Sequence, residues 1–487
     1  MKNRLIVSIL LFALLFCTSL FAAAKTLPSH PGKLTYAPLN WQVPDGEQYR
    51  TVLPNGMVAY IAEDHALPLV KVSGYVGCGT INDPAGKEGL YNVMAYLLRT
   101  GGTKKYPSDS LDALIDLYAM NVRISVSETQ MQFSFSCLSE YTHLCMDIMQ
   151  QMLLHPVFEE KKVKKALDLY AEDISHQFDN PGPILNAACE KAQYSNQPNS
   201  RMITLKSLNA ITRADIVNLH KQLFTTSPVI LSVAGDFNSN AMQTTLTNIF
   251  PKSNAGSKDS LFPTIVLNAP WKAVIVPKTI TQSYIRMSLP LFKRPNPDYY
   301  ALSVLNMVLG GSGFTSRLTS KVRSDEGLTY SIHSNAESNY TFPGTWYIDF
   351  FTKSESTCRA IALIQSEIQK LLAAGITDEE LDHAKSILIE GFPSMFRSPE
   401  DIADNYAVNE YLGRSMNHYK NYPGAIRAIT IKDVSAAAAK YLKPEAFVYT
   451  VVGDTAEIFK SDTVKGFSLR GLTPVKYVAP DSIPALP

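Results

Sequence analysis

The chain has 487 residues, with 45 Lys or Arg against 44 Asp or Glu and a formal net charge of +1. This even balance excludes the strongly basic composition typical of nucleic-acid-binding proteins. A chain of this length exceeds what a single hydrophobic core supports, which favours two or more domains.

Residues 1–24 have the pattern of a secretory signal peptide. Lys2 and Arg4 precede an almost wholly apolar run at 5–21, and alanines follow at 22–24. A basic start, a short apolar run and small residues are typical of a cleaved signal. An uncleaved anchor is the alternative, although the run is barely long enough to span a bilayer. We expect the mature chain to be secreted across the inner membrane into the periplasm, with no stable membrane insertion.

Five cysteines follow the predicted signal, and none forms a C-x-x-C pair: Cys78, Cys137, Cys145, Cys189 and Cys358. Isolated buried thiols are the simplest prediction. One disulfide is the alternative in an oxidising compartment, and the sequence does not assign it.

Residues 86–102 predict an amphipathic helix. Apolar residues at positions 90, 93, 94, 97 and 98 recur at helical spacing, and Gly101 is a suitable stop. Asn92, Ala95 and Tyr96 share another face.

Further along, apolar residues alternate with polar ones in 127–136, which predicts a half-buried strand.

Segments of the first half reappear in the second half at an offset of 218 residues. Residues 211–216 match 429–434, and residues 232–236 match 450–454. Thr212 and Thr430 are predicted helix caps, each with an acidic residue three positions later. Apolar runs at 229–233 and 447–452 predict buried strands. Several blocks at one offset indicate a duplication.

The duplication predicts two α+β domains of similar size, at 45–250 and 271–460. Residues 251–270 contain Lys, Ser, Asn, Gly and Pro, and they predict an interdomain linker. The tail at 461–487 has four prolines from Pro474 onwards, which predicts an extended segment.

The segments at 53–56, 77–80 and 89–90 resemble the start of a pitrilysin/insulinase-family domain. In active members the following helix carries H-x-x-E-H, in which two His bind zinc and the Glu activates a water molecule. The corresponding residues here are Asn92, Ala95 and Tyr96. Glu172 falls where the family has its third ligand, as a relic or as an ordinary solvated helix residue. An amide and a phenol with one carboxylate do not form a useful zinc site, so we expect no metal on this chain.

The second half resembles the family in another feature. Gly310, Gly311 and Gly313 lie in a Gly-rich segment that precedes Arg323 and Tyr330, which are seven residues apart. The resemblance implies that this Arg and this Tyr contact the substrate carbonyl. The glycines form either a helix end with a turn or a substrate-contacting loop.

The resemblance implies two homologous domains, each a mostly antiparallel sheet packed with helices, and the non-catalytic subunit of a heterodimeric zinc metallopeptidase. Zinc is then expected on a homologous partner chain with intact H-x-x-E-H. A peptide substrate would add to a sheet edge, for which 127–136 is the predicted strand. The alternative is a catalytically inert peptide-binding or scaffold protein on the same fold. No Ser-His-Asp or Cys-His signature supports an enzyme that acts alone by another chemistry.

Overall fold

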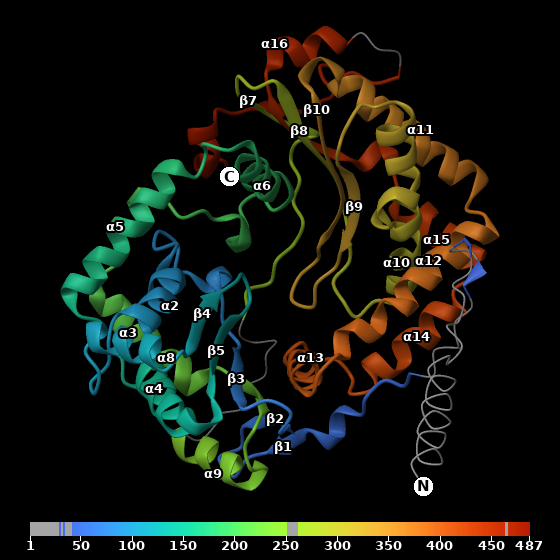
Figure 1. The fold of residues 1–487 in the computed structure, drawn as a ribbon. Coiled ribbons are helices and arrows are strands. Elements are labelled where there is room, and N and C mark those ends of the chain that lie inside the picture. The colour runs from blue at the N-terminus through green and yellow to red at the C-terminus, as the bar shows by residue number, and fades with distance from the viewer. Residues whose placement is uncertain (1–28, 31–32, 35–40, 251–261, 463–465) are drawn as a thin grey trace, which may run out of the picture. The chain divides into compact units, whose positions relative to one another are not determined.

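The structure is a computed structural model that describes residues 29–30, 33–34, 41–250, 262–462 and 466–487 (Figure 1). The predicted signal peptide at 1–24 and residues 251–261 of the predicted linker lie outside the described residues. Contacts divide the chain into residues 1–42 and 43–487, and both sheets belong to the second unit. No helix among the described residues is both long and apolar enough to cross a bilayer.

The first sheet has six strands in the order β1-β2-β6-β3-β5-β4. Only β6 and β2 pair in parallel, so the sheet is mostly antiparallel, as predicted. The strands are β1 Arg50–Val52, β2 Val58–Glu63, β3 Leu69–Val76, β4 Asn121–Val126, β5 Met131–Leu138 and β6 Val229–Gly235. The helices of this half are α2 Leu90–Thr100, α3 Ser108–Leu117, α4 Thr142–Leu154, α5 Glu160–His176, α6 Pro181–Gln193, α7 Leu205–Asn209, α8 Arg213–Thr226 and α9 Ser239–Ile249.

The second sheet has the order β12-β7-β11-β8-β10-β9, with parallel pairing only between β12, β7 and β11. Its strands are β7 Ala273–Pro277, β8 Gln282–Pro290, β9 Ile332–Glu337, β10 Thr345–Lys353, β11 Val448–Gly453 and β12 Val475–Tyr477. The helices are α10 Tyr299–Asn306, α11 Thr357–Ala374, α12 Asp378–Glu390, α13 Pro399–Tyr411, α14 His418–Ala428, α15 Ile431–Tyr441 and α16 Thr455–Ile458. The predicted α+β architecture with two similar halves is therefore confirmed.

The repeat seen in the sequence has a structural counterpart. β6 and β11 are central strands of their sheets, and α8 and α15 begin with the same capping box. The Thr212 side chain accepts from the Asp215 backbone N–H, and Thr430 does the same for Asp433. The backbone N–H groups of Thr212 and Thr430 donate to those carboxylates at 2.8 and 2.9 Å. The predicted caps are confirmed.

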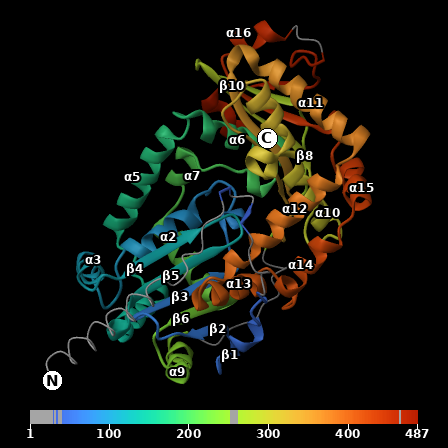
Figure 2. The same cartoon turned by 45° about the vertical axis from the view of Figure 1, so that its right-hand side comes forward.

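One pair of equivalent helices is exchanged between the two halves. α6 lies in the first half but packs on β7, β8 and β11 of the second sheet. α13, which begins 218 residues later, packs on β2, β3 and β6 of the first sheet (Figure 2). Ile184 and Ala188 of α6 are fully buried in a cluster with Val274 and Val452. Each sheet therefore needs a helix from the other half of the chain to bury one of its faces.

Two predictions about local structure need correction. The strand β5 of the alternating segment lies between β3 and β4, so the edge of the sheet is β4 instead. Met131, Phe133 and Phe135 are fully buried, because β5 has neighbours on both sides. Among the described residues of the tail, which was predicted to be extended, only β12 is a strand. Residues Pro480–Ala485 form a 3-10 helix, because Ile483 is drawn into the core with α6.

Candidate functional site

Helix α2 corresponds to the zinc-motif helix of the family that the sequence resembles. All five residues of its predicted apolar stripe are buried: Leu90, Val93, Met94, Leu97 and Leu98. The helix begins after Gly89, whose φ of +99° favours glycine.

The Asp83 carboxylate accepts hydrogen bonds from the backbone N–H groups of Gly89 at 2.8 Å and of Tyr91 at 3.0 Å. Burial raises the pKa of the Asp83 carboxyl to about 6. Asp83 thus fixes the start of α2, and nothing in the sequence motif marked it.

The face of α2 that carries H-x-x-E-H in active relatives is filled by an aromatic pair. The Tyr96 ring packs edge-on against Tyr170 of α5, with ring centroids 6.2 Å apart. The Tyr170 hydroxyl donates to the backbone carbonyl of Asn92 at 3.2 Å, and burial raises its pKa to about 12. Ala95 is buried, and the buried Asn92 Oδ1 has no hydrogen-bond partner among the described residues. Packed rings therefore lie beside the positions at which the resemblance places the metal ligands.

Glu172 lies on α5, two residues beyond Tyr170, and is exposed. Its carboxylate forms no hydrogen bond or ion pair with any other described residue. The structure does not bring it together with a His or Cys: across the described ranges, no group of three His, Cys, Asp or Glu is arranged to hold a metal. An amide, a methyl group and a phenol are a poor ligand set for zinc. The residues at these positions therefore do not fit the family's metal.

Arg323 and Tyr330 lie on the surface of the second half. Arg323 belongs to the π-helical turn Thr319–Asp325, and its guanidinium stacks on the Phe314 ring at 4.4 Å. Phe314 is 69% exposed and Tyr330 is 79% exposed. Neither the Arg323 guanidinium nor the Tyr330 hydroxyl makes a hydrogen bond or an ion pair within the part of the chain that the structure describes. Glu326, the acidic residue three positions after Arg323, is bound by Lys321 and Arg359 instead.

The Gly-rich segment is a packed turn rather than a free loop. α10 ends at Asn306 and continues as the π-helical turn Met307–Gly311. A Cβ on Gly310 would lie 2.7 Å from the backbone N of Ser334 in β9, so this position admits only glycine. Gly311 is similarly tight against Asn306, whereas Gly313 is open and has a φ of +63°. These glycines hold the turn that presents Phe314 and Arg323.

The structure keeps the two predicted sets of residues apart. No hydrogen bond, ion pair or ring contact among the described residues joins Arg323 or Tyr330 to Asn92, Tyr96 or Glu172.

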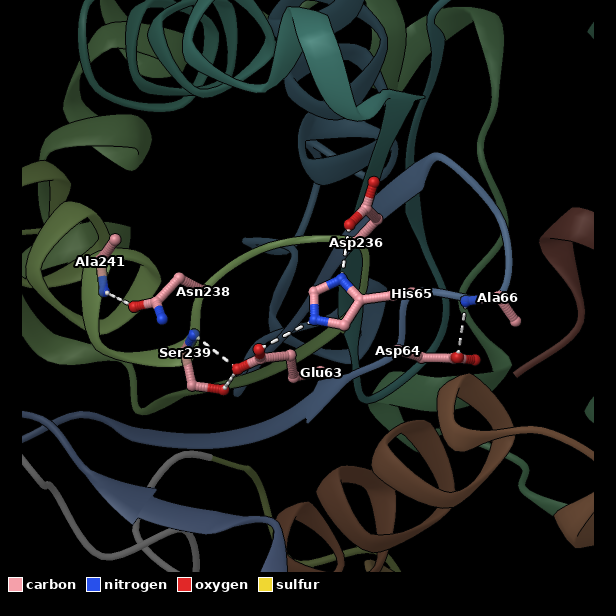
Figure 3. A network of polar contacts seen from close by, with 8 residues as sticks. All are labelled: Glu63, Asp64, His65, Ala66, Asp236, Asn238, Ser239 and Ala241. Carbon is pink, nitrogen blue, oxygen red and sulfur yellow. Dashed lines mark hydrogen bonds and ion pairs between the residues drawn. The ribbon is translucent and has the colours of Figure 1, made fainter.

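A polar network lies near the ends of β2 and β6 (Figure 3), and no motif in the sequence predicts it. His65 Nδ1 lies 2.6 Å from Asp236 Oδ1, and His65 Nε2 lies 3.0 Å from Glu63 Oε1. These contacts raise the pKa of His65 and lower the pKa of both carboxyls. The Ser239 hydroxyl donates to Glu63 at 2.6 Å rather than to His65, so the network is not a nucleophilic triad. It joins the strand ends to the start of α9.

Two duplicated α+β domains and a zinc-motif helix without its ligands define a homologue of two-domain metallopeptidases. The family description "Insulinase (Peptidase family M16)" matches residues 58–205, and "Peptidase M16 inactive domain" matches residues 210–388. The chain belongs to peptidase family M16, the insulinase family. The family predicted from the sequence is thereby confirmed.

Relatives and solved structures agree with this assignment. The chain is 22% identical over 400 residues to the "Non-peptidase homolog YmxG" of Helicobacter pylori, covering 80% of this chain and 90% of that protein. It is 24% identical over 341 residues to the "Uncharacterized zinc protease YmxG" of Bacillus subtilis, covering 69% and 81%. A crystal structure of a peptidase M16 inactive domain from Pseudomonas fluorescens has a TM-score of 0.74 at 21% identity, over 83% of this chain and 97% of that one. A protease from Helicobacter pylori has a TM-score of 0.71 at 17% identity, over 83% and 98%.

Proposed function

We propose that this chain is the non-catalytic subunit of a two-chain zinc peptidase and presents Arg323 and Tyr330 to a homologous partner that carries H-x-x-E-H. The observation that supports this most directly is that Arg323 stacks on the exposed Phe314 ring and has no acidic partner among the described residues, while Tyr330, seven residues later, is itself exposed. Exposed aromatic side chains, and an Arg that lacks an anionic partner, are typical of a surface that another molecule covers. The degenerate α2 supplies the reason why a second chain is needed.

The chemistry of peptide hydrolysis gives these two residues a role. The reaction passes through a tetrahedral intermediate in which negative charge develops on the former carbonyl oxygen. A guanidinium and a phenol O–H that are already in place stabilise this oxyanion. Removing one such donor typically costs about 2.7–4 kcal/mol in the barrier. The Arg323 fork can donate two parallel hydrogen bonds, which Lys cannot do.

The first sheet offers a place for the peptide itself. β4 is its edge strand, and exposed side chains alternate with half-buried ones along it. An extended peptide can pair with the outer side of such a strand. A cavity of about 430 Å³ opens on the same sheet, lined in part by Lys71, Asn121, Arg123 and Ser134. We propose that a peptide substrate runs along this edge and that its polar groups meet these side chains.

An inert scaffold or peptide-binding protein is the second candidate. The replaced residues at Asn92, Ala95 and Tyr96 favour it, as does the name of the Helicobacter pylori relative, a non-peptidase homolog. A scaffold makes no use of oxyanion donors. The two candidates therefore differ in the effect that they predict for Arg323→Ala and Tyr330→Phe on the peptidase activity of a reconstituted complex.

The first test is co-purification of the tagged chain from the native cell envelope, since we propose a periplasmic location. The expected result is a co-eluting homologue with H-x-x-E-H, about one zinc per pair, and chelator-sensitive cleavage of an unstructured peptide. Elution of this chain alone, without peptidase activity, would contradict the proposed subunit role.

Point variants then test the two donors in the reconstituted pair. Arg323→Ala and Tyr330→Phe should each lower kcat by about 100-fold or more while the pair still assembles. Arg470→Ala is a matched control, because the Arg470 guanidinium also stacks on a phenyl ring, that of the half-buried Phe459, at 4.3 Å. Tyr477→Phe is the control for the phenol, because Tyr477 is 50% exposed. Full activity of both donor variants in an intact pair would favour the scaffold instead.

A further inference from the structure

The second half contains a cavity of about 710 Å³ that is lined neither by α2 nor by Phe314, Arg323 or Tyr330. Its wall combines the end of the linker, the loop after β8, the β9–β10 hairpin and the loop after α13. Lys293 and Arg294 contribute positive charge to the wall, and no Asp or Glu is among its described residues. Phe262, Ile265 and Leu412 make much of the remaining wall apolar.

Arg294 is a buried cation that has no anionic partner in the described part of the chain. Its side chain is 9% exposed. The guanidinium stacks on the Tyr299 ring at 3.5 Å and on the Tyr340 ring at 4.6 Å. It forms no ion pair and no side-chain hydrogen bond with any residue that the structure describes. A buried charge is costly unless an opposite charge or hydrogen-bond partners compensate it.

A second guanidinium adds to the same positive field. The Arg414 Cζ lies 4.6 Å from the centroid of the same Tyr340 ring, and the buried Arg414 Nε has no hydrogen-bond partner among the described residues. Burial, with these two arginines nearby, lowers the pKa of His418 to about 4, so His418 is neutral at pH 7. The neighbouring carboxylate of Asp298 is bound by Lys440 and Tyr441 instead, each at 2.6 Å.

The same chain shows what a compensated site of this kind looks like. Arg286 is also largely buried and also stacks on a tyrosine, Tyr347, at 4.4 Å. There, Asp349 accepts two hydrogen bonds from the guanidinium, at 2.6 and 2.5 Å. Arg294 has the aromatic contacts without the carboxylate, so the missing group is an oxyanion.

We infer that this cavity binds a small organic anion, whose carboxylate or phosphate group pairs with Arg294 and whose apolar part packs on the aromatic wall. A planar guanidinium fork matches both oxyanions through two parallel hydrogen bonds. The cavity size is that of a small-molecule site. The inference does not rest on the proposed peptidase partner, because the chain alone supplies every residue of the wall.

The test measures the thermal midpoint of the purified mature chain in sodium benzoate, sodium phosphate and sodium chloride at equal ionic strength. The wild type should show a saturable rise in benzoate, in phosphate or in both, relative to chloride, because a ligand that binds only the folded state stabilises it. The salt that saturates at the lower concentration identifies the oxyanion. No saturable rise in either salt would overturn the inference.

Variants locate the site. Arg294→Met should weaken binding at least 10-fold, yet keep or raise the midpoint in chloride, because it removes an unpaired buried charge. Arg294→Lys keeps the charge without the fork and should bind more weakly than wild type. Arg470→Met is the control and should bind like wild type. An undiminished rise in Arg294→Met would overturn the inference.

Discussion

The ion pair between Glu410 and Arg50 ties the exchanged helix α13 to the first sheet, and its removal should destabilise the whole chain. Arg50 Nε and Nη2 donate to the two Glu410 oxygens at 2.8 and 2.7 Å. The Tyr60 hydroxyl donates to the same carboxylate at 2.6 Å. The pair is only partly buried, with side chains 33% and 26% exposed. Three hydrogen bonds to one carboxylate thus join residues that lie 350 or more positions apart in the sequence.

The expected cost of Glu410→Ala follows from this geometry. Breaking a fully buried pair costs about 3–5 kcal/mol, because the remaining charge stays uncompensated. Solvent screens a pair that is about one-third exposed, so we expect about 2 kcal/mol in the free energy of unfolding. The hydrogen bonds from Arg50 and Tyr60 lower the pKa of the Glu410 carboxyl, against its burial. This contribution is therefore present above the unfolded pKa of 4.5 and is lost as the pH falls through the lower folded value.

Urea unfolding of the wild type, Arg50→Ala, Glu410→Ala and the double variant measures this coupling. The double-mutant cycle should give about 1–2 kcal/mol at pH 7, and the difference between wild type and Glu410→Ala should shrink in acid. Arg359→Ala is the control, because its pair with Glu326 at 2.9 Å is well exposed and should contribute below about 0.5 kcal/mol. A coupling no larger than that of the control would refute the structural reasoning.

Two further predictions concern the first sheet. Gly74→Ala should lower the thermal midpoint by the equivalent of about 1–3 kcal/mol, because a Cβ would overlap the Phe133 ring; Gly182→Ala has open space and should show no such loss. Contacts with Asp236 and Glu63 raise the pKa of His65 in the folded state. The contribution of protonated His65 to the stability of the fold is therefore complete below the unfolded pKa of 6.5, and it is lost as the pH rises through the folded pKa. The difference in midpoint between wild type and His65→Gln should therefore shrink from about pH 6 to about pH 9, and a constant difference would contradict it.

Much of the candidate site could be predicted because it depends on local spacing. The apolar stripe of α2 fixed which face is buried, and this left Asn92 and Tyr96 on the family's metal-binding face. Arg323 and Tyr330 could likewise be singled out from the sequence, because they lie only seven residues apart. Asp83, by contrast, lies outside the motif and caps α2 only through the fold. The Glu63–His65–Asp236 network was missed because Asp236 is 171 residues from His65.

The sequence alone determined that the chain is a duplication, where the capped helices begin, and that the zinc ligands are replaced. These properties follow from residue identity and from periodicities of a few residues. Only the tertiary structure decided that α6 and α13 change places, that β4 rather than β5 is the sheet edge, and that Arg294 has no acidic partner among the described residues. A periodic pattern specifies that a face is buried, but it contains no information about which distant surface buries it. Charge compensation depends on the same distant neighbours, so an unpaired buried arginine looks like any other arginine until the chain has folded.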